Sequence, residues 1–115
     1  MHFTAFWRFT ILRGGMALGL LCLSNPPANA QDAGDAIFKS KCAMCHGPDG
    51  SGKTKMGETL KIPDLHSADV QKLSDAELTQ VISKGKNKMP PYDGKLSKDE
   101  IGKVVAFIRE VGKKR

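Results

Sequence analysis

The chain has 115 residues, with 18 Lys and Arg against 12 Asp and Glu, a formal net charge of +6, three cysteines and one tryptophan. This length corresponds to one small domain and argues against a two-domain enzyme. The basic balance raises the question of nucleic acid binding, but residues 31–115 contain no aromatic–basic motif of the kind that such binding uses.

The first 30 residues contain two arginines, no acidic residue and an apolar stretch over residues 14–23. Two prolines and the segment Ala28-Asn29-Ala30 follow. This pattern is typical of a secretory signal peptide, here predicted to be cleaved after Ala30. The apolar stretch is about half as long as the ~20 residues that a membrane span requires, so no permanent anchor is expected. We therefore expect a periplasmic domain over residues 31–115.

This domain is too small to be stable on a large core of its own. It retains Cys42 and Cys45, and a disulfide between residues three apart closes too small a loop to stabilise a fold. Strand signals are nearly absent, because no stretch alternates apolar and polar residues over more than a few positions. We expect an all-α domain whose core is completed by a bound group.

Two of the predicted helices precede the C-terminal one. The first begins at Asp32 or Asp35 and leads into the two cysteines. The second begins at Ser74, which forms a capping-box pattern with Glu77, and it ends at Gly85.

The last predicted helix begins at Ser97, which repeats the capping box with Glu100, and ends at Gly112. Its apolar residues share one face; they are Ile101, Val104, Val105, Ile108 and Val111. Two loops, residues 47–63 and 84–96, separate the three helices. The first loop has 17 residues, which is long for a bare domain and indicates that the loops wrap a large bound group.

The chemistry is concentrated in the segment Cys42-Ala43-Met44-Cys45-His46. Helical positions i, i+3 and i+4 share one face, so Cys42, Cys45 and His46 are expected to converge on one partner. C-x-x-C-H is the signature of covalent haem attachment through two thioethers, with the histidine reaching the iron. A thioredoxin-like redox pair would need a βαβ framework, and a zinc site would need four ligands, for which only His66 is left as a nitrogen donor.

Around this motif the chain resembles the class I cytochromes c, over nearly all of residues 32–112. Gly34 and Phe38 stand eight and four residues before the first cysteine of the motif, as in the family's N-terminal helix, and Phe107 matches the aromatic of its C-terminal helix. The resemblance implies a cytochrome c fold, three to four helices wrapped around one covalently bound haem c. It also implies close crossing of the terminal helices at Gly34. Pro63 would accept a hydrogen bond from the second ring nitrogen of His46.

The second axial ligand is predicted to be Met89. The two prolines that follow stiffen its loop, which suits a soft thioether held over iron and matches the family's methionine–proline ligand loop. Met44 points away from the face that the cysteines share, and Met56 is interpreted as a surface or packing methionine. A packing role for Met89 and a bis-histidine haem with His66 are the alternatives. The resemblance, however, places His66 on the His46 side of the haem.

The resemblance implies a one-electron carrier that cycles haem iron between Fe(II) and Fe(III) and is not an enzyme. One alternative is a haem enzyme or sensor with a displaceable sixth ligand, either peroxidase-like or gas-binding. Another is a fixed cytochrome subunit of a dehydrogenase or oxidase complex. Many family members bind a haem propionate with a tryptophan that the predicted mature chain lacks, so Tyr92 and nearby lysines are candidates for that role.

Lysines cluster in and beside the two loops, and we expect them to steer redox protein partners with acidic docking surfaces toward a monomeric carrier. The alternative is simple solvation of loops that lack apolar residues. The lysines are Lys53, Lys55, Lys61, Lys84, Lys86, Lys88 and Lys95.

Overall fold

The computed structural model describes residues 29–114, so the predicted signal peptide lies outside the described residues apart from its last two positions. Within this range the chain is helical, and its only paired extended residues form two isolated bridges, Lys86 with Met89 and Asp93 with Leu96. The helices are α1 (Ala30–Lys41), α2 (Ala43–His46), α3 (Lys55–Leu60), α4 (Ala68–Gln71), α5 (Asp75–Lys84) and α6 (Lys98–Lys113).

The expected all-α fold is confirmed, with three long helices and three short ones. Two of the short helices, α3 and α4, form where hydroxyl side chains cap them within the connecting segments. Thr54 accepts the amide hydrogen of Gly57 at the start of α3, and Ser67 accepts that of Val70 at the start of α4. Single-turn helices of this kind carry too little apolar periodicity to be predicted from sequence.

Both predicted capping boxes are present, at Ser74 and at Ser97. The predicted start of α1 and the predicted end of α6 are corrected. α1 begins at Ala30 after Asn29, and not at Asp32 or Asp35, because the Asn29 carbonyl already accepts the first amide hydrogens of the helix.

The helix α6 does not end at Gly112 as predicted, but continues to Lys113. A side chain on Gly112 would overlap with the Gln71 side chain, so this glycine serves close packing and not helix termination.

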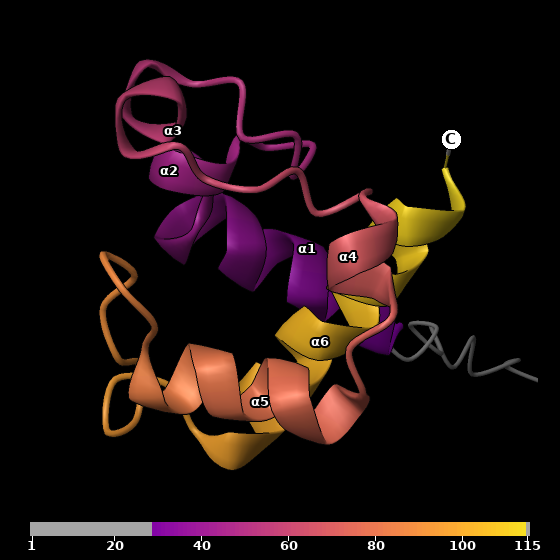
Figure 1. Ribbon diagram of the computed structural model, residues 1–115. Helices are drawn as coiled ribbons and strands as arrows, with labels where there is room; N and C mark the ends of the chain where they lie inside the picture. The colour runs from indigo at the N-terminus through magenta and orange to yellow at the C-terminus, as the bar shows by residue number, and fades with distance from the viewer. Residues whose placement is uncertain (1–28, 115) are drawn as a thin grey trace, which may run out of the picture.

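The helices α1 and α6 cross at the centre of the molecule, with α2 and α3 on one side and α5 on the other (Figure 1). A Cβ at Gly34 would overlap with the Lys103 carbonyl, as the close crossing implied by the resemblance requires. Phe38 is 1% exposed, and its ring centroid lies 4.7 Å from that of Phe107. This aromatic contact forms the centre of the core.

Arg109 joins α6 to the segment between α4 and α5. Its Nε lies 2.8 Å from the Asp75 carboxylate, and its Nη atoms donate to the carbonyls of Gln71 and Leu73. The carbonyls at the end of a short helix are thereby satisfied from a distant element. Within residues 29–114, none of the helices is both long and apolar enough to span a bilayer.

Candidate functional site

The predicted attachment motif lies at a break in the helix. α1 ends at Lys41, and α2 begins one residue after Cys42. The amide nitrogens of Cys45 and His46 donate to the Cys42 carbonyl at 3.2 and 2.9 Å. The three motif residues therefore share one turn of backbone, as their spacing predicts.

The two thiols are free and partly buried. Burial, together with the neighbouring Cys45, raises the pKa of the Cys42 thiol to about 11. A disulfide oxidoreductase instead depends on a thiolate with a lowered pKa, so the raised pKa of Cys42 disfavours a redox pair. Among residues 29–114, no group of three or more His, Cys, Asp or Glu side chains could hold a metal ion, so nothing there supports a zinc site.

His46 is partly buried, and burial lowers the pKa of its imidazole, which favours the neutral form that binds metals. Its Nδ1 is buried and has no hydrogen-bond partner among the described residues. The expected bond to the Pro63 carbonyl is therefore not present. Pro63 is exposed, and this part of the loop passes close to the backbone of Gly52, where a Cβ would lie 2.9 Å from the Ile62 carbonyl oxygen.

Two free thiols and a neutral imidazole within one turn of backbone are the donor set of a covalently attached haem. The residues of the motif therefore fit the group that the sequence predicts.

The first long loop is folded onto the motif. The Gly52 amide donates to the His46 carbonyl at 2.7 Å, and the Thr54 hydroxyl donates to the Cys45 carbonyl at 2.9 Å. A Cβ at Gly57 would lie 2.6 Å from that same Cys45 carbonyl oxygen, so α3 lies directly on α2. The loop is long because it covers the motif.

Met89 lies in a tight turn closed by hydrogen bonds in both directions with Lys86, at 2.9 and 3.2 Å. Gly85 permits this turn with a φ of 75°, and a Cβ there would lie 2.5 Å from the Met89 carbonyl oxygen. Met89 is partly buried and packs against the same core as Cys42. Met44 and Met56 are 78% and 43% exposed, so the structure separates Met89 from both of them.

His66 is engaged by a neighbour on the surface. Its Nδ1 lies 2.6 Å from the Asp64 carboxylate, which also accepts the His66 amide hydrogen at 2.8 Å. Ser67, the N-cap of α4, follows directly. These contacts fit a histidine that closes a turn before a helix.

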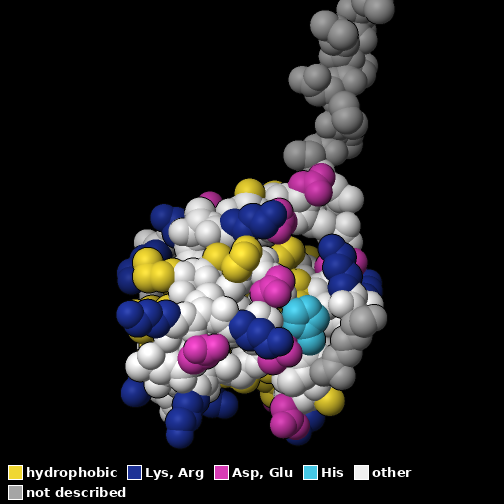
Figure 2. All heavy atoms as spheres, turned by 90° about the horizontal axis from the view of Figure 1, so that it is seen from above, with side chains coloured by type: hydrophobic (Ala, Val, Ile, Leu, Met, Phe, Trp, Pro, Cys, Tyr) yellow, Lys and Arg dark blue, Asp and Glu magenta, His cyan; other side chains and the backbone are white. Residues whose placement is uncertain are grey.

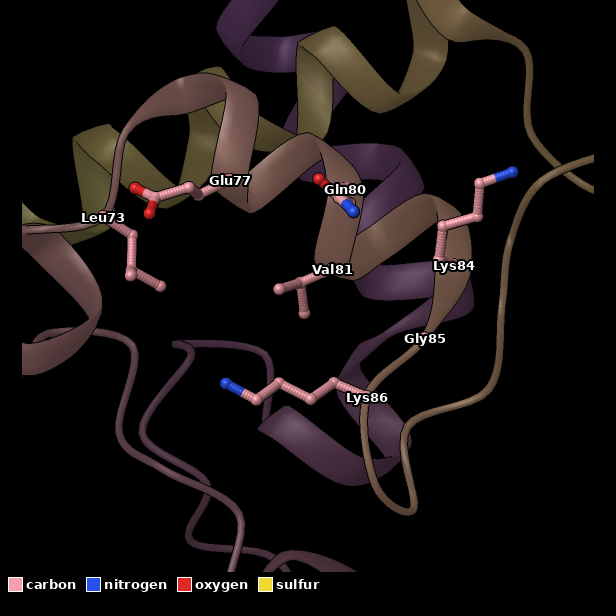
Figure 3. Close-up of a pocket in the computed structure, with 7 residues that line it drawn as sticks. All are labelled: Leu73, Glu77, Gln80, Val81, Lys84, Gly85 and Lys86. Carbon is pink, nitrogen blue, oxygen red and sulfur yellow. The ribbon is translucent and has the colours of Figure 1, made fainter.

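A cavity of about 330 Å³ adjoins the Met89 loop and is lined by α5 and the residues beside it. Leu73, Val81 and Lys86 point into the same space, whereas Lys84 points away from it (Figure 3). The cavity is not lined by the motif residues themselves. It therefore marks space beside the predicted ligand loop and not the attachment point.

The sequence does not show whether Tyr92 or a nearby lysine binds a haem propionate. In the structure the Tyr92 hydroxyl donates to the Lys41 carbonyl at 2.9 Å, 51 residues away in the chain. The sequence offers a single tyrosine directly after the Met-Pro-Pro segment, but its position there does not identify the Lys41 carbonyl as the acceptor.

An all-α fold that closes two loops around a C-x-x-C-H motif defines a c-type cytochrome. Residues 29–108 match the family model described as "Cytochrome C oxidase, cbb3-type, subunit III". A "Cytochrome c6-like" protein from Nostoc sp. (strain PCC 7120) is 34% identical, over 84% of this chain and 86% of that protein. A solved structure titled "KustC0563 c-type cytochrome" is 31% identical, with a TM-score of 0.63, over 68% of this chain and 95% of that one.

The chain therefore belongs to the class I c-type cytochromes, haem proteins of electron transport, and its cofactor is covalently attached haem c. It is also similar to the "Cbb3-type cytochrome c oxidase subunit FixPc" of Rhizobium leguminosarum bv. viciae, at 33% identity over 78% of this chain. The chain spans about a third of the length of that relative, 31%.

Proposed function

We propose that this cytochrome is a periplasmic one-electron carrier whose haem is held by Cys42, Cys45, His46 and Met89. The observation that supports this proposal most strongly is the position of Met89. It is the methionine that the fold holds against the core with Cys42, in a turn that Gly85 closes, while the other mature methionines are exposed.

The bound haem supplies a reversible change between Fe(II) and Fe(III), and no substrate bond is made or broken. Cys42 and Cys45 provide the thioether sulfurs, and His46 provides a neutral imidazole. Met89 provides a neutral, soft thioether, which stabilises the ferrous state relative to an anionic ligand and raises the reduction potential. Leu73 and Val81 line the space beside the Met89 loop with apolar side chains.

The predicted signal peptide supports a periplasmic location. Cleavage after Ala30 would remove Asn29 and the first residue of α1, and the mature helix would begin at Gln31. The aromatic contact that holds α1 on α6 lies two turns further on, so the crossing does not depend on the removed residues.

The exposed lysines of the two loops support docking to redox protein partners with acidic surfaces. Lys84 is paired with Asp93 at 3.1 Å, so its charge is partly neutralised. On the α2–α3 side, Lys and Arg side chains are interspersed with acidic ones (Figure 2). We therefore assign the steering charge to the Met89 loop, with Lys86, Lys88 and Lys95. This function requires no nucleic acid, and a monomer suffices for it.

A second candidate is a fixed cytochrome subunit of an oxidase complex. The match to the cbb3-type subunit III model and the similarity to FixPc support it. Fractionation separates the two. A carrier is recovered as a monomer from the periplasm, whereas a fixed subunit co-purifies with membrane-bound oxidase.

The haem enzyme or sensor alternative is tested by adding carbon monoxide to the purified ferrous protein. A carrier with Met89 on the iron should show one reversible one-electron wave in a redox titration and no spectral change with carbon monoxide at neutral pH. Rapid, complete carbon monoxide binding would reject the carrier in favour of a haem with an open or displaceable sixth position.

A further inference from the structure

The carbonyl of Lys41 stands at the break between α1 and α2. In a continuous helix it would accept the amide hydrogen of Cys45, but that amide donates to the Cys42 carbonyl. The break therefore frees the Lys41 carbonyl, and the Tyr92 hydroxyl donates to it at 2.9 Å. A carbonyl at the end of α1 is thus satisfied by a residue 51 positions later in the chain.

The backbone of Tyr92 is anchored to a different element. Its amide donates to the Ile82 carbonyl at 3.0 Å, and the amide of Asp93 donates to the Ser83 carbonyl at 3.0 Å. These bonds satisfy carbonyls in the last turn of α5. Tyr92 therefore links two helices, with its amide bonded to α5 and its hydroxyl bonded to the end of α1.

The ring of Tyr92 is held between these two anchors. It packs against the core together with Cys42 and Met89, and the Lys95 Nζ lies 5.7 Å from its centroid. Met89 stands three residues before Tyr92. The distance that Met89 keeps from the attachment motif therefore depends on how firmly Tyr92 joins the two segments.

We propose that Tyr92 is a positioning residue, whose hydroxyl locks the Met89 loop to the residue before the attachment motif and so slows the opening of that loop. This inference rests on the proposed ligation by Met89. A phenylalanine would retain the packing of the ring but leave the Lys41 carbonyl without its donor, so the lock is a property of the hydroxyl.

The test compares the ferric holoprotein with Tyr92→Phe by mixing each with imidazole, which reaches the iron only after Met89 has left it. At saturating imidazole the observed rate equals the rate of loop opening. Tyr92→Phe should keep the far-red sulfur–iron band at neutral pH in the absence of imidazole. Its limiting rate should rise about three- to tenfold, the factor that corresponds to one neutral hydrogen bond.

Thr54→Val is the matched control. The Thr54 hydroxyl also donates to a backbone carbonyl of the motif at 2.9 Å, but from α3. This variant should lower the stability of the protein and leave the imidazole rate unchanged. A wild-type rate in Tyr92→Phe, or equal acceleration by Thr54→Val, would overturn the role of Tyr92.

These results are distinguishable from failure of the proposed function, because a wild-type protein without the sulfur–iron band would reject Met89 as ligand whatever the rates. If Tyr92→Phe does not retain haem, proton exchange on the wild type decides. The Tyr92 hydroxyl proton, which is donated to the Lys41 carbonyl, should then exchange slowly enough with water to give a resolved NMR signal. A hydroxyl proton that exchanges too fast to be observed would contradict the lock.

Discussion

Cys42 and Cys45 are the residues that make attachment of the haem covalent. Because they are the only cysteines of the predicted mature chain, both should be consumed as thioethers. Thiol titration of the denatured mature holoprotein should find no reactive thiol, and acid acetone should not extract the haem. Cys42→Ala should retain haem poorly. One free thiol per chain, or haem that acid acetone removes, would contradict double attachment.

Gly85 has a backbone that only glycine adopts readily, with φ 75° and ψ 167°. Gly85→Ala adds this strain and drives a methyl group toward the Met89 carbonyl, so we expect a weakened sulfur–iron band and a loss of about 2 kcal/mol or more in unfolding free energy. Visible spectra and guanidinium titrations of the holoprotein measure both effects.

The control is Gly94→Ala in the same loop. Gly94 also has a positive φ, 80°, but no atom lies within 4 Å of its would-be Cβ. This variant should lose only about 1–2 kcal/mol of backbone preference and keep the band at full intensity. Equal spectral damage in the two variants would show that backbone strain, and not contact with the Met89 segment, governs the loop.

Among the elements, α1 and α6 form the centre of the core where they cross. Gly34→Ala would force the two helices apart, because its Cβ overlaps with the Lys103 carbonyl oxygen. We expect a loss of about 1–3 kcal/mol in the unfolding free energy, as for other overpacked cores. Gly102→Ala on the exposed face of α6 meets no atom within 4 Å and should gain up to about 1 kcal/mol from helix propensity. Denaturant unfolding of the two holoproteins gives both values, and a Gly34→Ala protein as stable as the wild type would contradict the crossing.

The elements also show why some boundaries could be predicted and others could not. Ser74 and Ser97 begin α5 and α6 as expected, because a capping box is local in sequence. The start of α1 was missed because Asn29 makes no side-chain cap hydrogen bond. Gly112 was misread as a terminator, because the side chain that packs against it, Gln71, belongs to another helix.

Within the site, the local motif predicted the backbone turn that Cys42, Cys45 and His46 share. The prolines singled out Met89 as the second ligand, which stays a prediction. The resemblance implied a hydrogen bond between His46 and the Pro63 carbonyl, and this prediction is wrong, because the buried Nδ1 of His46 has no partner within residues 29–114. The segment before Pro63 passes close to the backbone of Gly52 instead. The Tyr92 contact joins residues 51 apart in the chain, and no local pattern encodes it.

At the scale of the whole molecule, the haem is expected to be part of the fold. Without it, the two long loops must close around an unfilled centre at about 1–2 kcal/mol of conformational entropy per ordered backbone residue. We predict a largely disordered apoprotein when Cys42 and Cys45 are both replaced by alanine and no haem is bound. Far-ultraviolet circular dichroism and thermal scans check this. Native-like helicity with a cooperative melt would contradict it.

The central claim, that Met89 and His46 would both bind the haem iron, is tested most directly by the visible spectrum of the ferric protein and two methionine variants. The wild type and Met56→Ala should show a weak sulfur–iron band in the far red. Met89→Ala should lose the band, bind small ligands and have a lower reduction potential. If Met56→Ala loses the band while Met89→Ala keeps it, or if only His66→Ala changes the spectrum, the assignment of Met89 is wrong.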